Sequence, residues 1–188
     1  VYFKPDTKIF PKTNFNLKSI LEQAESKSFL NKGLKIIVRG EGGKQAFQYP
    51  NGIQDYIGKI IGSRHPLTET PFYIEKNNQK MRLEIAFQWA SETDTVIHSY
   101  ANSIKTVDGG SHETGFRNGM TKALRTYIDR RNLLPKGVSN ITSDDVREGL
   151  IAIISVYLQG EVEFQGQTKG RLNSDITSQV ESVVKHSL

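Results

Sequence analysis

The stretch from Met81 to Trp89 constrains the fold of this chain more than any other. Every second residue in it is apolar, and the set comprises Met81, Leu83, Ile85, Phe87 and Trp89. Successive side chains of a β-strand point to opposite faces of the sheet, so this pattern predicts a strand with one face on a hydrophobic core. The nearest candidate partners are residues 72–75 before it and 95–101 after it. The sequence therefore predicts an antiparallel meander.

Helical patterns flank this sheet, and polar residues mark where several of them begin. Asn14 or Asn16 is the expected N-terminal cap of the first helix, and Ser111 that of the longest. Thr142 and Asp145 have the spacing of a capping box. The predicted helices cover residues 17–29, 53–61, 111–128, 143–148 and 176–188. A further apolar run over 150–156 predicts a buried strand, which makes the chain an α+β domain with a mostly antiparallel sheet.

Composition excludes several classes of protein. The 188 residues are 36% hydrophobic, which suits one compact domain, and they include no cysteine, so disulfides and thiolate metal sites are excluded. No apolar run approaches the roughly 20 residues of a membrane span, and no signal peptide is recognisable. We therefore expect a cytoplasmic protein. The net charge of +5 permits binding to phosphates but identifies no partner.

No self-contained catalytic site is predicted. Gly58-Lys59 lacks the preceding glycine spacing and the following Ser or Thr of a phosphate loop. The glycines at 40–43 lie between two short strands, which favours a hairpin turn. The four histidines are scattered without the paired spacing of metal ligands, so no metal site is expected. No serine sits in a strained glycine elbow with histidine and aspartate partners.

Two features leave a functional and a plain interpretation open. The long helix carries a basic side, which is more often a solvated face than a nucleic-acid surface: Arg117, Lys122, Arg125, Arg130 and Arg131. The polar loop 164–172 carries Lys169, a compact charge suited to a terminal phosphate, and Gln167, whose amide donates hydrogen bonds. The same loop is also compatible with an ordinary connection between a strand and the last helix.

The tripeptide Gln167-Thr168-Lys169 resembles the QTK loop of the ATPase subunits of bacterial type IIA DNA topoisomerases, gyrase B and its topoisomerase IV counterpart. Other motifs agree with that family in order and spacing along essentially the whole chain. They are Phe29-Leu30-Asn31-Lys32-Gly33, Ser99-Tyr100-Ala101-Asn102, Gly109-Gly110-Ser111-His112-Glu113, Gly115-Phe116-Arg117 and Asp144-Asp145-Val146-Arg147-Glu148-Gly149-Leu150. A lone tripeptide means little, but this ordered set is specific.

The resemblance implies the second, transducer domain of that subunit. Its fold is similar to domain two of ribosomal protein S-five, with helices packed on a mostly antiparallel sheet and a left-handed βαβ crossover. General rules of chain connection would give the opposite hand. Residues 1–8 are then the closing strand of, and the link from, a preceding GHKL ATPase domain. Residues 9–188 are the transducer domain, which ends before a TOPRIM domain.

The resemblance also implies roles for individual residues. Lys169 contacts the γ-phosphate of ATP, Gln167 assists, and Arg117 faces the cavity through which a DNA duplex passes. ATP is bound mainly by the GHKL domain, and Mg²⁺ belongs to the full-length enzyme, so this segment alone is not expected to be catalytic. The implied partners are the GHKL and TOPRIM domains, a second copy of the subunit, the gyrase A or topoisomerase IV A subunit and double-stranded DNA. The alternative is a stand-alone nucleic-acid-binding module of the same fold.

Overall fold

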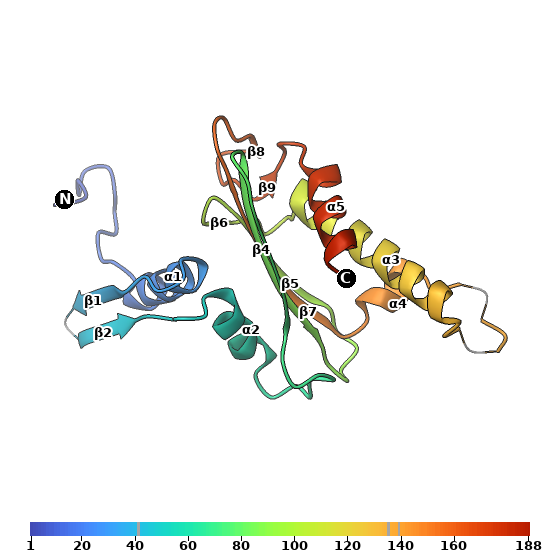
Figure 1. Ribbon diagram of the computed structural model, residues 1–188. Coiled ribbons are helices and arrows are strands. Elements are labelled where there is room, and N and C mark those ends of the chain that lie inside the picture. The colour runs from blue at the N-terminus through green and yellow to red at the C-terminus, as the bar shows by residue number, and fades with distance from the viewer. Residues whose placement is uncertain (41, 135, 139) are drawn as a thin grey trace. The chain divides into compact units, whose positions relative to one another are not determined.

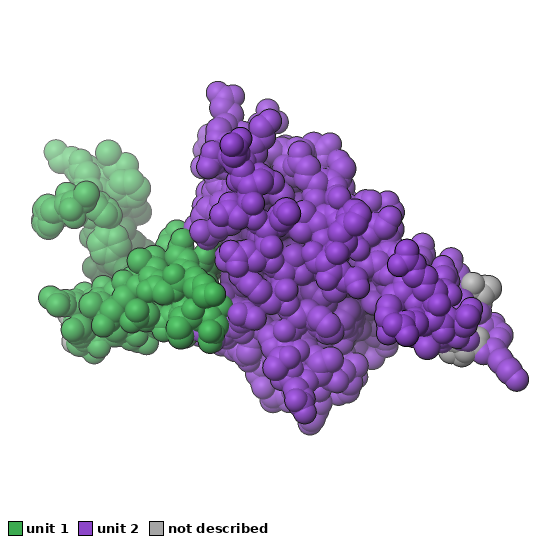
Figure 2. Space-filling view, in the orientation of Figure 1, with its two compact units in different colours: residues 1–52 green, residues 53–188 purple. Residues whose placement is uncertain are grey.

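The computed structural model describes residues 1–40, 42–134, 136–138 and 140–188 (Figure 1). It divides the chain into two compact units, Val1–Gly52 and Ile53–Leu188 (Figure 2). The boundary expected at residue 8 concerns a preceding ATPase domain and stays a prediction. None of the described helices is long and apolar enough to cross a membrane.

The first unit consists of one helix and a two-stranded hairpin. Helix α1 spans Leu17–Leu30, and the Asn16 side chain caps it by accepting a hydrogen bond of 3.2 Å from the Ser19 amide. Strands β1 (Ile36–Gly40) and β2 (Gly43–Phe47) pair antiparallel, which confirms the predicted hairpin, although Glu41 in its turn lies outside the described residues. Residues 1–16 contain a turn over 7–9 and no helix or strand.

The second unit contains a five-stranded sheet in the order β3-β4-β7-β5-β6. Its strands are β3 (Phe72–Asn77), β4 (Met81–Trp89), β5 (Val96–Ala101), β6 (Ile104–Lys105) and β7 (Leu150–Leu158). Strand β4 has the predicted bounds and pairs antiparallel with β3, as expected. The second half of the predicted meander is wrong, because β7 lies between β4 and β5. Strand β7 is apolar at nearly every position, and a central place buries both of its faces.

Strands β5 and β7 run parallel, which requires a crossover between them. Helices α3 (Ser111–Arg131) and α4 (Ser143–Arg147) lie on that connection. The antiparallel pairings of the other neighbours confirm the mostly antiparallel α+β sheet. The left hand of the crossover stays a prediction from the resemblance.

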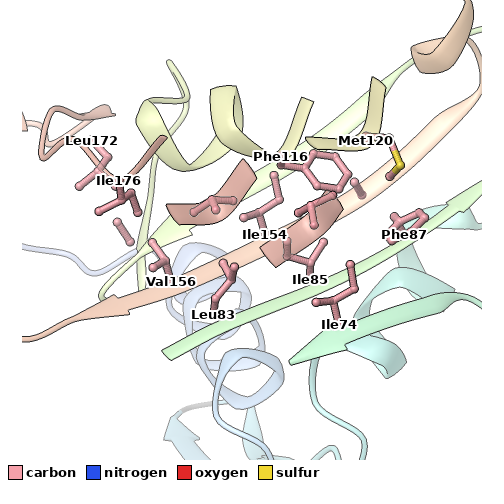
Figure 3. Packing of buried hydrophobic residues seen from close by; sticks show 14 of the residues in the cluster. Ile74, Leu83, Ile85, Phe87, Phe116, Met120, Ile154, Val156, Leu172 and Ile176 are labelled. Atoms are coloured by element: carbon pink, nitrogen blue, oxygen red, sulfur yellow. The ribbon is translucent and has the colours of Figure 1, made fainter. Parts of the chain in front are cut away.

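Helices cover both faces of the sheet. Phe116 and Met120 of α3 belong to the same main core as Ile85 and Ile154 of the sheet (Figure 3), and α5 (Thr177–Ser187) packs beside α3. Helix α2 (Ile53–Ile61) contacts β4 and β7. The expectation that β4 has a single buried face is therefore wrong, since Gln88 on the other face is only 2% exposed and donates a 3.0 Å hydrogen bond to the Thr68 hydroxyl.

The two predicted caps in this unit fare differently. Asp145 and Thr142 form the capping box, with the Asp145 amide 3.2 Å from the Thr142 hydroxyl and the Thr142 amide 2.8 Å from the Asp145 carboxylate. Ser111, in contrast, does not cap α3. Gly110 occupies the cap position with a φ of 144°, and the Ser111 hydroxyl donates instead to the Ser174 carbonyl at 2.5 Å. The hydrogen bond to Ser174, a residue distant in sequence, therefore replaces the predicted capping bond of Ser111.

Candidate functional site

The QTK segment forms the tip of a short hairpin. Strands β8 (Phe164–Gln165) and β9 (Arg171–Leu172) pair antiparallel, and a turn over residues 166–169 joins them. Gln167, Thr168 and Lys169 are all exposed. Lys169 has a left-handed φ of 54°, and its ammonium lies 5.6 Å from the centre of the Phe164 ring, within the range of a cation–π contact. The hairpin thus presents a lysine at its tip.

The base of this hairpin is fastened to the turn that precedes α3. The Asp108 amide donates to the Gly170 carbonyl at 2.8 Å, and the Leu172 amide donates to the Gly109 carbonyl at 3.1 Å. A Cβ on Gly110 would lie 2.5 Å from the Leu172 carbonyl oxygen, so only glycine fits between the two segments. Backbone hydrogen bonds and close packing therefore join the hairpin base to the start of α3.

Arg117, two turns into α3, is held by Glu113. The Arg117 Nε donates to Glu113 Oε1 at 3.1 Å, and its Nη2 bonds the same oxygen. The Ser99 hydroxyl of β5 donates to the other oxygen, Oε2, at 3.1 Å. The Glu113 side chain is 15% exposed and that of Arg117 is 36% exposed. The arrangement orients the guanidinium while leaving part of it open to solvent.

A buried histidine completes this polar cluster. The Thr106 hydroxyl bonds both the Ser99 hydroxyl, at 2.7 Å, and His112 Nε2, at 3.0 Å. Burial lowers the pKa of His112 to about 4, so its imidazole is neutral at pH 7. Its Nδ1 has no hydrogen-bond partner among the residues that the structure describes.

Replacing His112 by glutamine should flatten the dependence of stability on pH. Between its ordinary pKa of 6.5 and its folded value of about 4, the unfolded chain binds more protons than the native one, so stability falls as pH falls through this range. At pH 4.5 the part of the free energy of unfolding that is lost because of His112 is about 2 kcal/mol. Urea unfolding at pH 7 and pH 4.5 measures it. An equal loss of unfolding free energy between pH 7 and pH 4.5 in the unchanged protein and in His112→Gln would contradict this account.

Arg117 and Glu113 also line a groove of about 840 Å³ beside α3. Its lining includes both cations and carboxylates: Lys105, Asp108, Glu113, Arg117, Asp144, Arg147 and Glu148. Arg147 is paired with Asp144. The groove therefore has mixed charge, unlike a uniformly basic nucleic-acid channel.

Several cations of the predicted basic side of α3 are engaged by neighbouring groups. Lys122 pairs with Glu181 of α5, and Arg125 donates to the Ile141 carbonyl at 2.8 Å. Arg131 lies 5.8 Å from the centre of the Tyr127 ring. Only Arg117 of this set lies near the hairpin base among the residues described. Within the same described ranges no group of three or more His, Asp or Glu side chains is placed to hold a metal ion.

Comparison with known proteins assigns this architecture to a family. The family model described as DNA gyrase B matches residues 52–188. The chain belongs to the DNA gyrase B family. A DNA gyrase B protein from Cytophaga hutchinsonii is 34% identical over 100% of this chain and 41% of its own length. The chain spans less than half the length of the curated gyrase B relatives it matches.

Solved structures show the same fold. The 43K ATPase domain of Thermus thermophilus gyrase B superposes with a TM-score of 0.84 and 29% identity, over 98% of this chain and 50% of that one. The topoisomerase IV ATP-binding domain of Francisella tularensis gives a TM-score of 0.80 and 30% identity, over 97% of this chain and 49% of that one. The fold is therefore that of gyrase B and topoisomerase IV ATPase regions.

Proposed function

We propose that this chain is the transducer domain of a type II topoisomerase ATPase subunit, coupling ATP binding and hydrolysis to closure of a DNA gate and strand passage. The observation that carries the proposal is the hairpin, which exposes Lys169 at its tip and is fastened at its base to α3. Membership of the gyrase B family supports it. Alanine in place of Lys169 tests it, because hydrolysis indifferent to this ammonium would exclude the proposed role.

The nucleotide part of the proposal rests on Lys169 and Gln167. Both side chains are exposed on one turn, as residues that reach a ligand in a neighbouring domain must be. Lys169 would hold the γ-phosphate of ATP and Gln167 would donate a hydrogen bond to it. A preceding GHKL domain would supply most of the ATP site, including its Mg²⁺. The role of this chain is therefore to complete a site, and not to catalyse alone.

A switch requires a ligand that contacts one conformation better than another. The Lys169 contact would exist only while the γ-phosphate is attached, and hydrolysis would remove it. Because the hairpin base is fastened to α3, release of the tip would free the sheet and its helices to turn relative to the ATPase domain. Two ATPase subunits closing in this way, together with the gyrase A or topoisomerase IV A partners and the TOPRIM domains, would pass one DNA duplex through another.

The DNA part of the proposal rests on Arg117, whose partly exposed guanidinium would contact the phosphates of the transported duplex. Alanine at this position should lower the slope of log affinity against log salt by about one, equally on unrelated sequences, because one phosphate contact is lost. Binding of the intact ATPase subunit to two unrelated duplexes, from about 50 mM to about 200 mM salt, measures the slope.

The matched control is alanine in place of Arg125, which lies on the same helix but is bound to the Ile141 carbonyl. Its slope should equal that of the unchanged protein. If Arg117→Ala and Arg125→Ala behaved alike, Arg117 would have no special role. Tight duplex binding by this chain alone, dependent on Arg117 and indifferent to Lys169, would instead favour a stand-alone nucleic-acid-binding module.

A further inference from the structure

We infer that Glu113 is a positioning residue that links the base of the QTK hairpin to Arg117, so that the presentation of Arg117 to DNA follows the position of the hairpin. The inference rests on the proposed function of both ends. Its basis is that one carboxylate near the start of α3 contacts Arg117 on the same helix, Ser99 on β5 and the turn at Gly109.

Glu113 contacts a residue of its own helix, a residue of β5 and the turn that precedes α3. Oε1 accepts both hydrogen bonds of the Arg117 guanidinium, one turn further along α3. Oε2 accepts from the Ser99 hydroxyl of β5 at 3.1 Å. A Cβ on Gly109 would lie only 2.9 Å from Oε2, so the carboxylate rests directly on the backbone of this turn. Any larger residue at position 109 would require the Glu113 carboxylate to shift.

The far side of the same turn holds the hairpin. The Gly109 carbonyl accepts from the Leu172 amide at 3.1 Å, and the Asp108 amide donates to the carbonyl of Gly170, the residue after Lys169. A Cβ on Gly170 would lie 2.5 Å from Asp108 Oδ2, so these segments are also in close contact. A series of hydrogen bonds and van der Waals contacts therefore connects the hairpin base to Arg117.

The Arg117–Glu113 pair differs from an ordinary ion pair on a helix surface, which contributes little and adapts freely. Glu113 is 15% exposed, and Ser99, which holds it from β5, is 2% exposed and bonded to Thr106. The Ser99 hydrogen bond and the contact with the Gly109 turn favour the observed position of the carboxylate. A shift of the turn would displace the carboxylate, and the guanidinium bonded to it would follow.

The test uses the intact ATPase subunit in complex with its gyrase A or topoisomerase IV A partner and compares ATP hydrolysis with and without linear DNA. The variants are Glu113→Gln, which keeps the size and removes the charge, Arg117→Ala, and the double variant. Each single change should lower the ratio of the two rates by about five- to tenfold, in line with ordinary coupling between sites. The double variant should lose no more than either single variant, because both changes break one path.

Two further variants separate positioning from damage to the fold. Glu148→Gln removes a carboxylate from the same groove and should leave the ratio unchanged. Ser99→Ala frees one end of Glu113 and should lower the ratio in the same direction. A merely structural defect would lower both rates together, so an unchanged ratio in Glu113→Gln and Ser99→Ala overturns the inference.

The outcomes distinguish the inference from the function on which it rests. A lower ratio in Arg117→Ala with an unchanged ratio in Glu113→Gln leaves the DNA role of Arg117 in place and overturns the link. Losses that multiply in the double variant also overturn it, because they show independent action. An unchanged ratio in Arg117→Ala overturns the proposed DNA contact itself, and the link with it.

Discussion

Alanine in place of Lys169 is expected to lower ATP hydrolysis by the intact ATPase subunit on the order of 100-fold, while nucleotide affinity falls by less than about tenfold. The reason is the place of the lysine. It stands on an exposed hairpin tip, whereas residues of a preceding domain would bind the bulk of the nucleotide. A single cation at the γ-phosphate stabilises the charge that develops there in the transition state more than it stabilises the bound ground state.

Steady-state hydrolysis and the affinity for a non-hydrolysable ATP analogue separate these two effects. Lys80→Ala is the matched control, because it removes another exposed lysine of the same unit, at the turn between β3 and β4. Gln167→Ala should have a smaller effect than Lys169→Ala, since it removes a neutral donor. Turnover in Lys169→Ala equal to that of the Lys80→Ala control would exclude the γ-phosphate role.

Elements defined by local pattern could be predicted from the sequence. Strand β4 and helix α2 begin and end where the apolar spacing predicts, and the capping box at Thr142 and Asp145 is present. In each case the signal lies within a few residues, because period, propensity and capping are local properties. The antiparallel partner β3 also follows locally, through the short turn after Asn77.

Pairing between distant segments could not be predicted in the same way. The sequence places β5 directly after β4, yet the distant strand β7 takes the place between them, as the register Ile85↔Ile154 shows. The decisive quantity is the burial of both faces of β7, which depends on helices on each side of the sheet. A run of apolar residues predicts a buried strand but not which neighbours bury it.

The candidate site shows the same division. The tripeptide at 167–169 directs attention to Lys169 and Gln167, and the polar residues and glycines around it predict a loop. The attachment of that loop to Gly109 joins segments that are far apart in the sequence. The position of Glu113 between Ser99 and Arg117 depends on how β5 packs beside α3. Glu113 reads locally as a favourable charge in the first turn of a helix. Its pairing with Arg117 four residues on is also a local property, whereas its contact with Ser99 of β5 is visible only in the fold.

Alanine at both Gly115 and Gly119 is expected to destabilise the second unit by about 3 kcal/mol, although alanine favours helices over glycine by about 1 kcal/mol per site. These glycines are one turn apart on the face of α3 that meets α5. A Cβ on Gly115 would lie 2.5 Å from the Thr177 carbonyl oxygen, and one on Gly119 would lie 2.7 Å from that of Glu181. Backbone atoms cannot rotate away, so the helices must separate and lose packing along their whole contact.

Gly58 provides the matched control, because it lies within α2 and a Cβ there would meet nothing within 4 Å. The same substitution at Gly58 should stabilise by up to about 1 kcal/mol, as helix propensity alone predicts. Thermal and urea unfolding of the three proteins therefore compare one chemical change with opposite expected signs. A double variant at 115 and 119 that is as stable as Gly58→Ala would contradict this expectation. It would mean that α3 and α5 tolerate separation and that the close approach of their backbones does not hold α3 in place.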